Sequence, residues 1–183
     1  MYLDVRIPFD EEGRLAMAYS RALDDGISEW VLFLDHDVFL CNPRWYEMCL
    51  EAIETLKQDP KAAAIGCECG GEHHKRTMSE KGVPTDKLDL YIQESMDYYF
   101  EYGNMLQRIH TPIPGFFMLM KREVAREIGF VQKKRNINNI DTDFGNRLMK
   151  AGYHIYQMRG LYIYHRRGMK HLKKEFKIIN DET

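Results

Sequence analysis

Two aspartates, Asp35 and Asp37, directly follow a run of five apolar residues, Trp30 to Leu34. Such a run predicts a buried strand, and carboxylates beside a core are costly unless something pairs with them. Side chains two positions apart in a strand point to the same side, so we expect both carboxylates on one face, roughly 6–7 Å apart. They repel each other unless they share a cation or accept from a hydroxyl group. A hard divalent cation that carries a phosphate is the simplest partner.

The segments around this pair alternate between short apolar runs and amphipathic stretches, which is typical of an α/β layer fold. We expect strands at 3–9, 29–34 and 62–67, a strand running into a short helix that ends at Gly129 within 114–130, and two closing strands within 153–165. Further helices are expected at 10–25, 43–58 and 86–107, and a loop that leads into a helix within 138–153, with Asp10 as the N-cap of the first and Asn42-Pro43 opening the second. In such sheets ligands bind at the carboxyl ends of the strands, where the aspartate pair falls.

The composition excludes several classes of protein. A net charge of −2 over 183 residues gives no electrostatic basis for binding nucleic acid or an anionic membrane. No apolar run reaches the roughly 18–20 residues that a membrane span needs, and no signal peptide is evident. Four cysteines in a chain of this size suit a reducing compartment, so we expect a cytoplasmic protein of one domain.

Two classes of enzyme place D-x-D after an apolar strand. Phosphohydrolases of the haloacid dehalogenase type use the first aspartate as a nucleophile. They normally have Thr or Val two residues past the second aspartate, where this chain has Phe39, and they need a Gly-Asp dipeptide that it lacks. Metal-dependent glycosyltransferases of the GT-A fold use D-x-D to hold a nucleotide-sugar. A solvated strand end with no chemistry is the third reading of the pair.

The remaining motifs resemble glycosyltransferase family 2 in their order along the chain. They are "VRIP" (5–8), "LFLDHDV" (32–38), "PGFFMLMKREVAREIGF" (114–130), "IDTDFGNRLMKAGYHIY" (140–156) and "YIYH" (162–165). The chain is similar to the very short members, such as those carried by viruses. The resemblance implies a single-domain, Rossmann-like GT-A fold over residues 1–165, a three-layer sandwich around a mixed, mostly parallel sheet. A single helix replaces the usual strand-helix-strand unit before D-x-D, so the nucleotide-binding half is truncated.

The resemblance also implies the roles of the site residues. Asp37 and His165 are expected to hold a metal ion, with Asp35 bridging to it or lying nearer the ribose. Mn²⁺ is favoured over Mg²⁺ because an imidazole joins the carboxylates. Asp141 or Asp143 is expected to be the catalytic base, although both aspartates could simply cap a helix. Ile140 stands where the family's E-D motif has its glutamate.

Three segments complete the expected site. Pro8, Phe9 and Asp10 are where the nucleotide base would lie, although they could equally end a strand and begin a helix. Gly115 would let the backbone approach the donor sugar, although glycine after proline is also an ordinary turn, and Asp141 would also lie against the sugars. The basic tail, residues 166–183, could close over the diphosphate through Arg166, Arg167 and Lys170, touch an anionic lipid surface, or remain solvated.

The sequence therefore predicts a metal-dependent, inverting glycosyltransferase. Its donor would be a nucleoside-diphosphate sugar, with a UDP-sugar favoured and a GDP-sugar as the alternative, and its acceptor a hydroxyl group of a carbohydrate or another molecule. A nucleotide- or sugar-binding module without turnover is the second hypothesis, because Ile140 and the truncated half both allow it. A phosphohydrolase is the third. Oligomeric state is left open.

Overall fold

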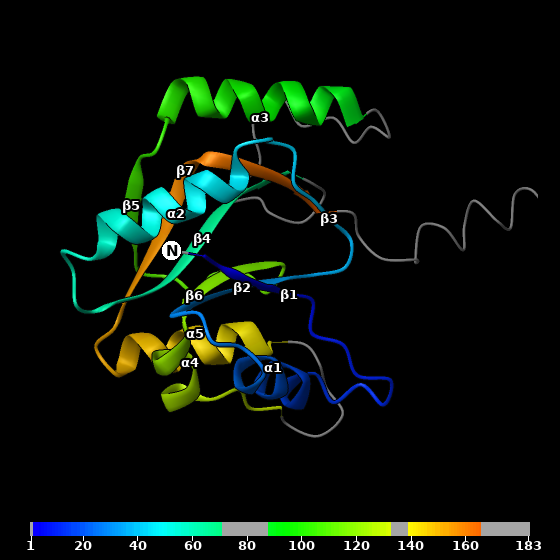
Figure 1. The fold of residues 1–183 in the computed structure, drawn as a ribbon, viewed down its shortest axis with the longest axis vertical. Helices are drawn as coiled ribbons and strands as arrows, with labels where there is room; N and C mark the ends of the chain where they lie inside the picture. Colours follow the sequence, from blue (N-terminus) through cyan, green and yellow to red (C-terminus); the bar gives the residue numbers. More distant parts are fainter. Residues whose placement is uncertain (1, 71–87, 133–138, 166–183) are drawn as a thin grey trace, which may run out of the picture.

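The structure is a computed structural model that describes residues 2–70, 88–132 and 139–165. A mixed β-sheet lies at the centre of this part of the chain (Figure 1). Its strands are β1 (Asp4–Arg6), β2 (Trp30–Leu34), β3 (Val38–Phe39), β4 (Ala62–Gly70), β5 (Leu106–Ile109), β6 (Phe117–Lys121) and β7 (His154–His165). The helices are α1 (Leu15–Asp24), α2 (Trp45–Leu56), α3 (Leu88–Tyr102), α4 (Arg122–Ile128) and α5 (Ile140–Lys150).

The strands lie in the order β1-β2-β6-β4-β7-β3, and β5 also pairs with β7. β1 is parallel to β2 and β4 is parallel to β7, while β6 runs antiparallel to both β2 and β4. β1, β2, β4 and β7 therefore share one direction, and their carboxyl ends lie at one edge of the sheet. β3 and β5 are antiparallel to β7. The predicted mixed sheet is confirmed, with β6 inserted between two parallel pairs. It is not mostly parallel, because β6, β3 and β5 all pair antiparallel to their neighbours.

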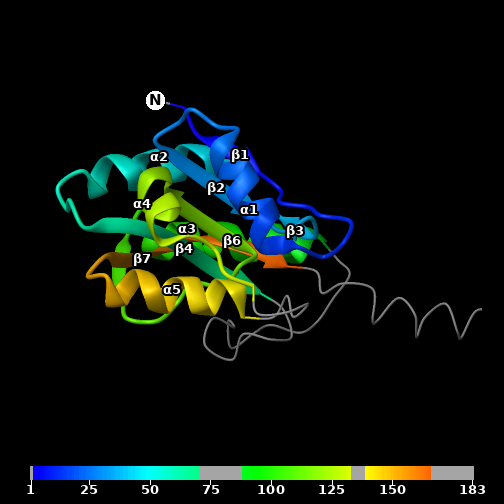
Figure 2. The same cartoon turned by 90° about the horizontal axis from the view of Figure 1, so that it is seen from below.

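Helices cover both faces of the sheet, which confirms the predicted three layers. α2 and α3 lie on one side of it and α1, α4 and α5 on the other (Figure 1, Figure 2). β2 is buried at all five positions because its side chains alternate between the two layers. Leu32 packs in the core beneath α2, whereas Val31 and Phe33 pack in the core beneath α1.

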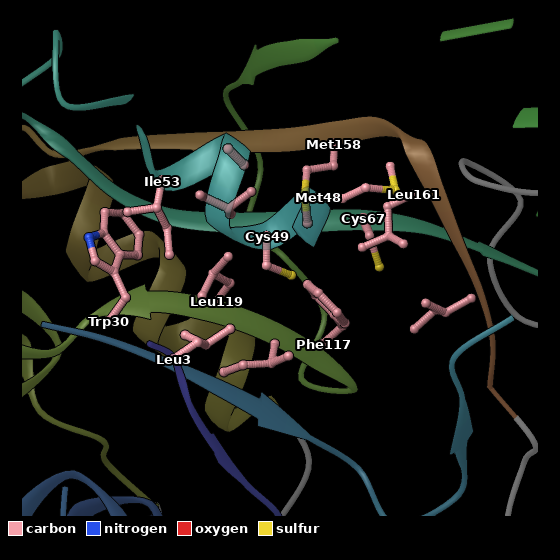
Figure 3. Packing of buried hydrophobic residues seen from close by; sticks show 14 of the residues in the cluster. Leu3, Trp30, Met48, Cys49, Ile53, Cys67, Phe117, Leu119, Met158 and Leu161 are labelled. Atoms are coloured by element: carbon pink, nitrogen blue, oxygen red, sulfur yellow. The ribbon is translucent and has the colours of Figure 1, made fainter. Parts of the chain in front are cut away.

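The core beneath α2 is built from closely packed apolar side chains (Figure 3). Cys49 of α2 points toward Phe117 and Leu119 of β6, and Met48 and Ile53 belong to the same cluster. Phe117 and Leu119 are fully buried, so this layer fixes the position of β6 beside β2. The site described below lies at the ends of these strands.

A single helix connects β1 to β2, which confirms the predicted truncation. Arg122, at the start of α4, is only 3% exposed and holds this connection in place. Its Nε donates to the carbonyl oxygen of Ser28 (2.7 Å), and its other nitrogens donate to the carbonyl oxygen of Leu23 and to the Asp4 carboxylate. The end of α1, the start of β1 and the approach to β2 are thereby tied to α4.

Two predicted elements are wrong in the second half of the chain. The helix expected at 86–107 ends at Tyr102, and Gly103 follows it with a positive φ of 53°. Leu106–Ile109 instead forms β5, because it finds a pairing partner in β7. The two strands expected within 153–165 are one strand, β7, whose pairing with β4 shifts register after Met158. The apolar pattern located both segments. Strand pairing decided where the helix ends and that the last segment is one continuous strand.

The start of the first helix also differs from the expectation. α1 begins at Leu15, and the side chain of its N-cap residue, Arg14, makes no capping hydrogen bond. Asp10 lies in the preceding loop, where its carboxylate accepts from the backbone N–H groups of Glu12 and Arg14, both at 3.1 Å. The expectation that Asp10 caps this helix is therefore wrong, because its carboxylate closes a turn five residues earlier.

Candidate active site

The two aspartates converge with His165, but not as an extension of a strand. β2 ends at Leu34, and Asp35 and Asp37 lie in the turn that leads to β3. β3 then pairs with the end of β7, which places Val38 opposite His165. The expected strand geometry of the aspartate pair is wrong, since a turn separates β2 from β3. Pairing between β3 and β7 instead brings the imidazole to the carboxylates across 128 positions of sequence.

The three side chains form a compact group of metal-binding type. His165 Nε2 lies 3.1 Å from Asp37 Oδ1 and 3.6 Å from Asp35 Oδ2. One ligand atom from each of the three residues lies within 4.8 Å of the other two. Ligands of a single divalent cation lie roughly 3–5 Å apart, so the spacing fits one ion. Two carboxylates with an imidazole are a donor set that suits Mn²⁺.

The charge at the cluster is consistent with a cation site. Burial raises the pKa of Asp35 above its ordinary value. Nearby His165 acts against this rise, while the charge of Asp37 adds to it. The Asp35 carboxylate is therefore held in a half-buried place beside a second negative charge. A bound divalent cation would remove this penalty. The charge as well as the spacing of these three residues therefore suits a divalent cation.

Asp141 lies beside this cluster, in the first turn of α5. Its Oδ2 accepts from the backbone N–H of Gly115 at 2.7 Å, and its Oδ1 accepts from that of Thr142 at 2.8 Å. Its negative charge contributes to the raised pKa of Asp35. A side chain at position 115 would meet the Asp141 carboxylate at 3.4 Å, so Gly115 and Asp141 lie in close contact.

Asp143 is engaged elsewhere. Its Oδ2 accepts from Nε of Arg147 at 2.8 Å, and the Arg147 guanidinium also donates to the carbonyl oxygens of Ile128 and Gly129. This network ties α5 to the end of α4. Of the two aspartates predicted as the base, Asp141 is the one that the fold brings toward the cluster of Asp35, Asp37 and His165.

The residues expected around the nucleotide base lie in the loop between β1 and α1. Phe9 is 73% exposed. Asp10 is surrounded by Arg14 and Arg21, whose Nη2 atoms lie 3.2 and 2.6 Å from its Oδ2. Hydrogen bonds from Arg14 hold the pKa of Asp10 well below its usual range. The Asp10 carboxylate therefore already accepts hydrogen bonds from two arginines of the same chain.

Two residues at the site carried no signal in the sequence. Burial raises the pKa of the Tyr19 phenol, and the charges of Asp35 and Asp141 raise it further. The ring of Phe116 packs on the imidazole of His165, with 5.0 Å between ring centres. Tyr19 lies in a predicted helix and Phe116 in a predicted strand, and neither contact follows from local periodicity. Arg166, Arg167 and Lys170 lie outside the described residues.

All four cysteines are buried free thiols. No helix within the described residues has the length and apolar character to cross a membrane.

The three-layer sandwich, with an acidic turn at the carboxyl end of β2, is a fold of GT-A-like type. The family model of glycosyl transferase family 2 matches residues 2–129, well over half of the chain. The chain belongs to this family, and its membership supports glycosyltransferase activity. The match includes Asp35, Asp37 and Gly115 and ends before Asp141 and His165. None of the curated proteins compared with the chain matches it.

Proposed function

We propose that this protein is a metal-dependent, inverting glycosyltransferase that moves a sugar from a nucleoside-diphosphate sugar to an acceptor hydroxyl group. The observation that carries the proposal is the convergence of Asp35, Asp37 and His165 with Asp141, in a chain of glycosyl transferase family 2. An acceptor hydroxyl is a poor nucleophile until its proton is removed. A diphosphate is a good leaving group only when its charge is offset. The site offers a group for each requirement.

Asp37 and His165 would hold the cation, with Asp35 either completing its ligands or binding the ribose. Mn²⁺ suits these donors best, and Mg²⁺ is the alternative. The bound cation would offset the negative charge of the departing diphosphate. Arg166, Arg167 and Lys170 of the basic tail are the side chains that we propose to assist on the same group.

Asp141 would act as the base. Two backbone N–H groups fix its carboxylate, from Gly115 and from Thr142. Each carboxylate oxygen keeps a further lone pair, so the carboxylate can still accept the proton of the attacking hydroxyl group. Inversion follows when that hydroxyl attacks the sugar on the side opposite the diphosphate. Asp143 is the weaker candidate because Arg147 pairs with it.

The nucleotide base would lie against Pro8 and Phe9, whose exposed ring offers a surface for stacking. Since Asp10 is held by Arg14 and Arg21, we propose that it orients these arginines and makes no direct hydrogen bond to the base. A UDP-sugar is the favoured donor and a GDP-sugar the alternative. We propose a cytoplasmic location.

The test is calorimetric titration of UDP and GDP, each with and without Mn²⁺, into the wild type and two variants. Asp37→Ala removes a proposed metal ligand, and Asp89→Ala removes an exposed carboxylate at the start of α3 as a matched control. We expect one diphosphate to bind only with Mn²⁺, and Asp37→Ala alone to abolish binding. Metal-independent binding, or equal binding by both variants, would contradict the proposed role of the cluster.

Transfer itself is tested by incubating the wild type with the matching nucleotide-sugars and a panel of sugar acceptors. Release of the nucleoside diphosphate and the anomeric configuration of the product, read by NMR, report turnover and inversion. Binding without turnover of any donor, water included as acceptor, would instead indicate a nucleotide- or sugar-binding module.

A further inference from the structure

The two residues before β6 contact both parts of the proposed active site. The backbone N–H of Asp35 donates to the carbonyl oxygen of Phe116 at 3.1 Å. This hydrogen bond extends the pairing of β2 with β6 by one residue past Leu34 and Phe117. The start of the acidic turn is therefore fixed to the main chain of Phe116.

The side chain of the same residue contacts the imidazole. The Phe116 and His165 rings lie 5.0 Å apart between centres, with an angle of 36° between their planes. Phe116 is 4% exposed and belongs to the core beneath α2, so its ring has little freedom to move. It forms one wall beside the imidazole, whose Nε2 faces the carboxylates of Asp35 and Asp37.

The pairing of β3 with β7 fixes only the backbone of His165, through its position opposite Val38. The direction of Nε2 depends on two side-chain torsions that this pairing leaves free. Metal-binding histidines are usually oriented by a hydrogen bond from the second ring nitrogen, and losing that contact weakens the metal site although every ligand remains. Here the ring of Phe116 packs against the imidazole and restricts its rotation.

The preceding residue anchors the segment on its other side, since the N–H of Gly115 donates to Asp141. Taken with the proposed function, on which this inference rests, we propose that Phe116 is a positioning residue for the metal ligand His165. It contacts neither the metal nor the substrate. Its ring holds the imidazole so that Nε2 faces the two aspartates before any metal binds.

The test is the affinity of the metal-free protein for Mn²⁺ alone, read from the EPR signal of free Mn²⁺. Phe116→Leu removes the ring and keeps the site apolar. Phe117→Leu is the matched control, because the neighbouring ring is fully buried in the same core. We expect Phe116→Leu to weaken Mn²⁺ binding by roughly 10-fold. Phe117→Leu should leave the affinity unchanged, even where it lowers the urea midpoint as much.

If Phe116→Leu does not fold, Phe116→Met, which keeps more of the volume, replaces it with the same expectation. Equal Mn²⁺ affinity in the wild type and the Phe116 variant would overturn the positioning role and leave the proposed function intact. Equal weakening by Phe116→Leu and Phe117→Leu would also overturn it, because the loss would then come from the core as a whole. A wild type that binds no Mn²⁺ would overturn both this inference and the metal dependence.

Discussion

Arg122 is the side chain whose removal should test the single connection between β1 and β2 most directly. It donates to the carbonyl oxygens of Ser28, Leu23 and Ala22, and it pairs with the Asp4 carboxylate in a largely buried place. Removing one partner of such a pair costs about 3–5 kcal/mol, because the other charge stays behind without compensation. Met fills much of the same volume. We therefore expect Arg122→Met to lower the free energy of unfolding by about 3–5 kcal/mol.

The matched control is Arg126→Met, one turn further along α4. Arg126 donates to the carbonyl oxygen of Leu23, and its Nε lies 3.5 Å from Oδ1 of Asp24. Its side chain is nevertheless 43% exposed. An exposed pair is worth at most about 1 kcal/mol, so the control should cost little. Urea unfolding followed by circular dichroism gives both values. A domain of this size has about 5–15 kcal/mol in total, so the difference is well within reach of the measurement.

A second variant checks the cause of the loss. Adding Asp4→Asn to Arg122→Met removes the stranded carboxylate and should recover part of the stability. Equal losses for Arg122→Met and Arg126→Met would refute the reasoning, since burial of the pair would then carry no weight. No recovery in the double variant would show that the charge on Asp4 is not the source of the cost.

Asp141→Asn should lower the rate of sugar transfer by roughly 10²–10⁴ at saturating donor while diphosphate binding persists, whereas Asp143→Asn should keep most of the rate; the reverse order would make Asp143 the base. A second prediction concerns pH: burial raises the pKa of Asp59, but hydrogen bonds from His154 and Tyr156 outweigh it and leave the pKa below its ordinary value. A carboxyl with a lowered pKa stabilises the fold above its unfolded pKa and loses this effect as the pH falls through the folded value. The stability deficit of Asp59→Asn, measured in urea, should therefore shrink below about pH 4, and a deficit independent of pH would contradict this.

Local pattern was sufficient for much of the fold. The five apolar residues Trp30 to Leu34 predicted β2 because a strand covered on both faces has no polar position. The helix expected at 43–58 is present as α2, but Asn42 and Pro43 do not open it. It begins at Trp45, because the Asn42 carboxamide oxygen accepts from the N–H of Arg44 and closes a turn before the helix. The segment at 103–109 failed for the opposite reason. Its strand state depends on pairing with β7, which no neighbouring residue reveals.

The sequence by itself determined which residue types stand at the candidate site, since D-x-D, the later aspartates and His165 are all visible in it. Only the tertiary structure decided which of them meet. The pairing of β3 with β7 brings His165 to Asp37. Asp141 differs from Asp143 in its contacts, because Asp141 accepts from Gly115 whereas Asp143 pairs with Arg147. Periodicity reports how each segment is buried. Contacts between distant segments depend on strand order and register, which are set by the packing of the whole sheet.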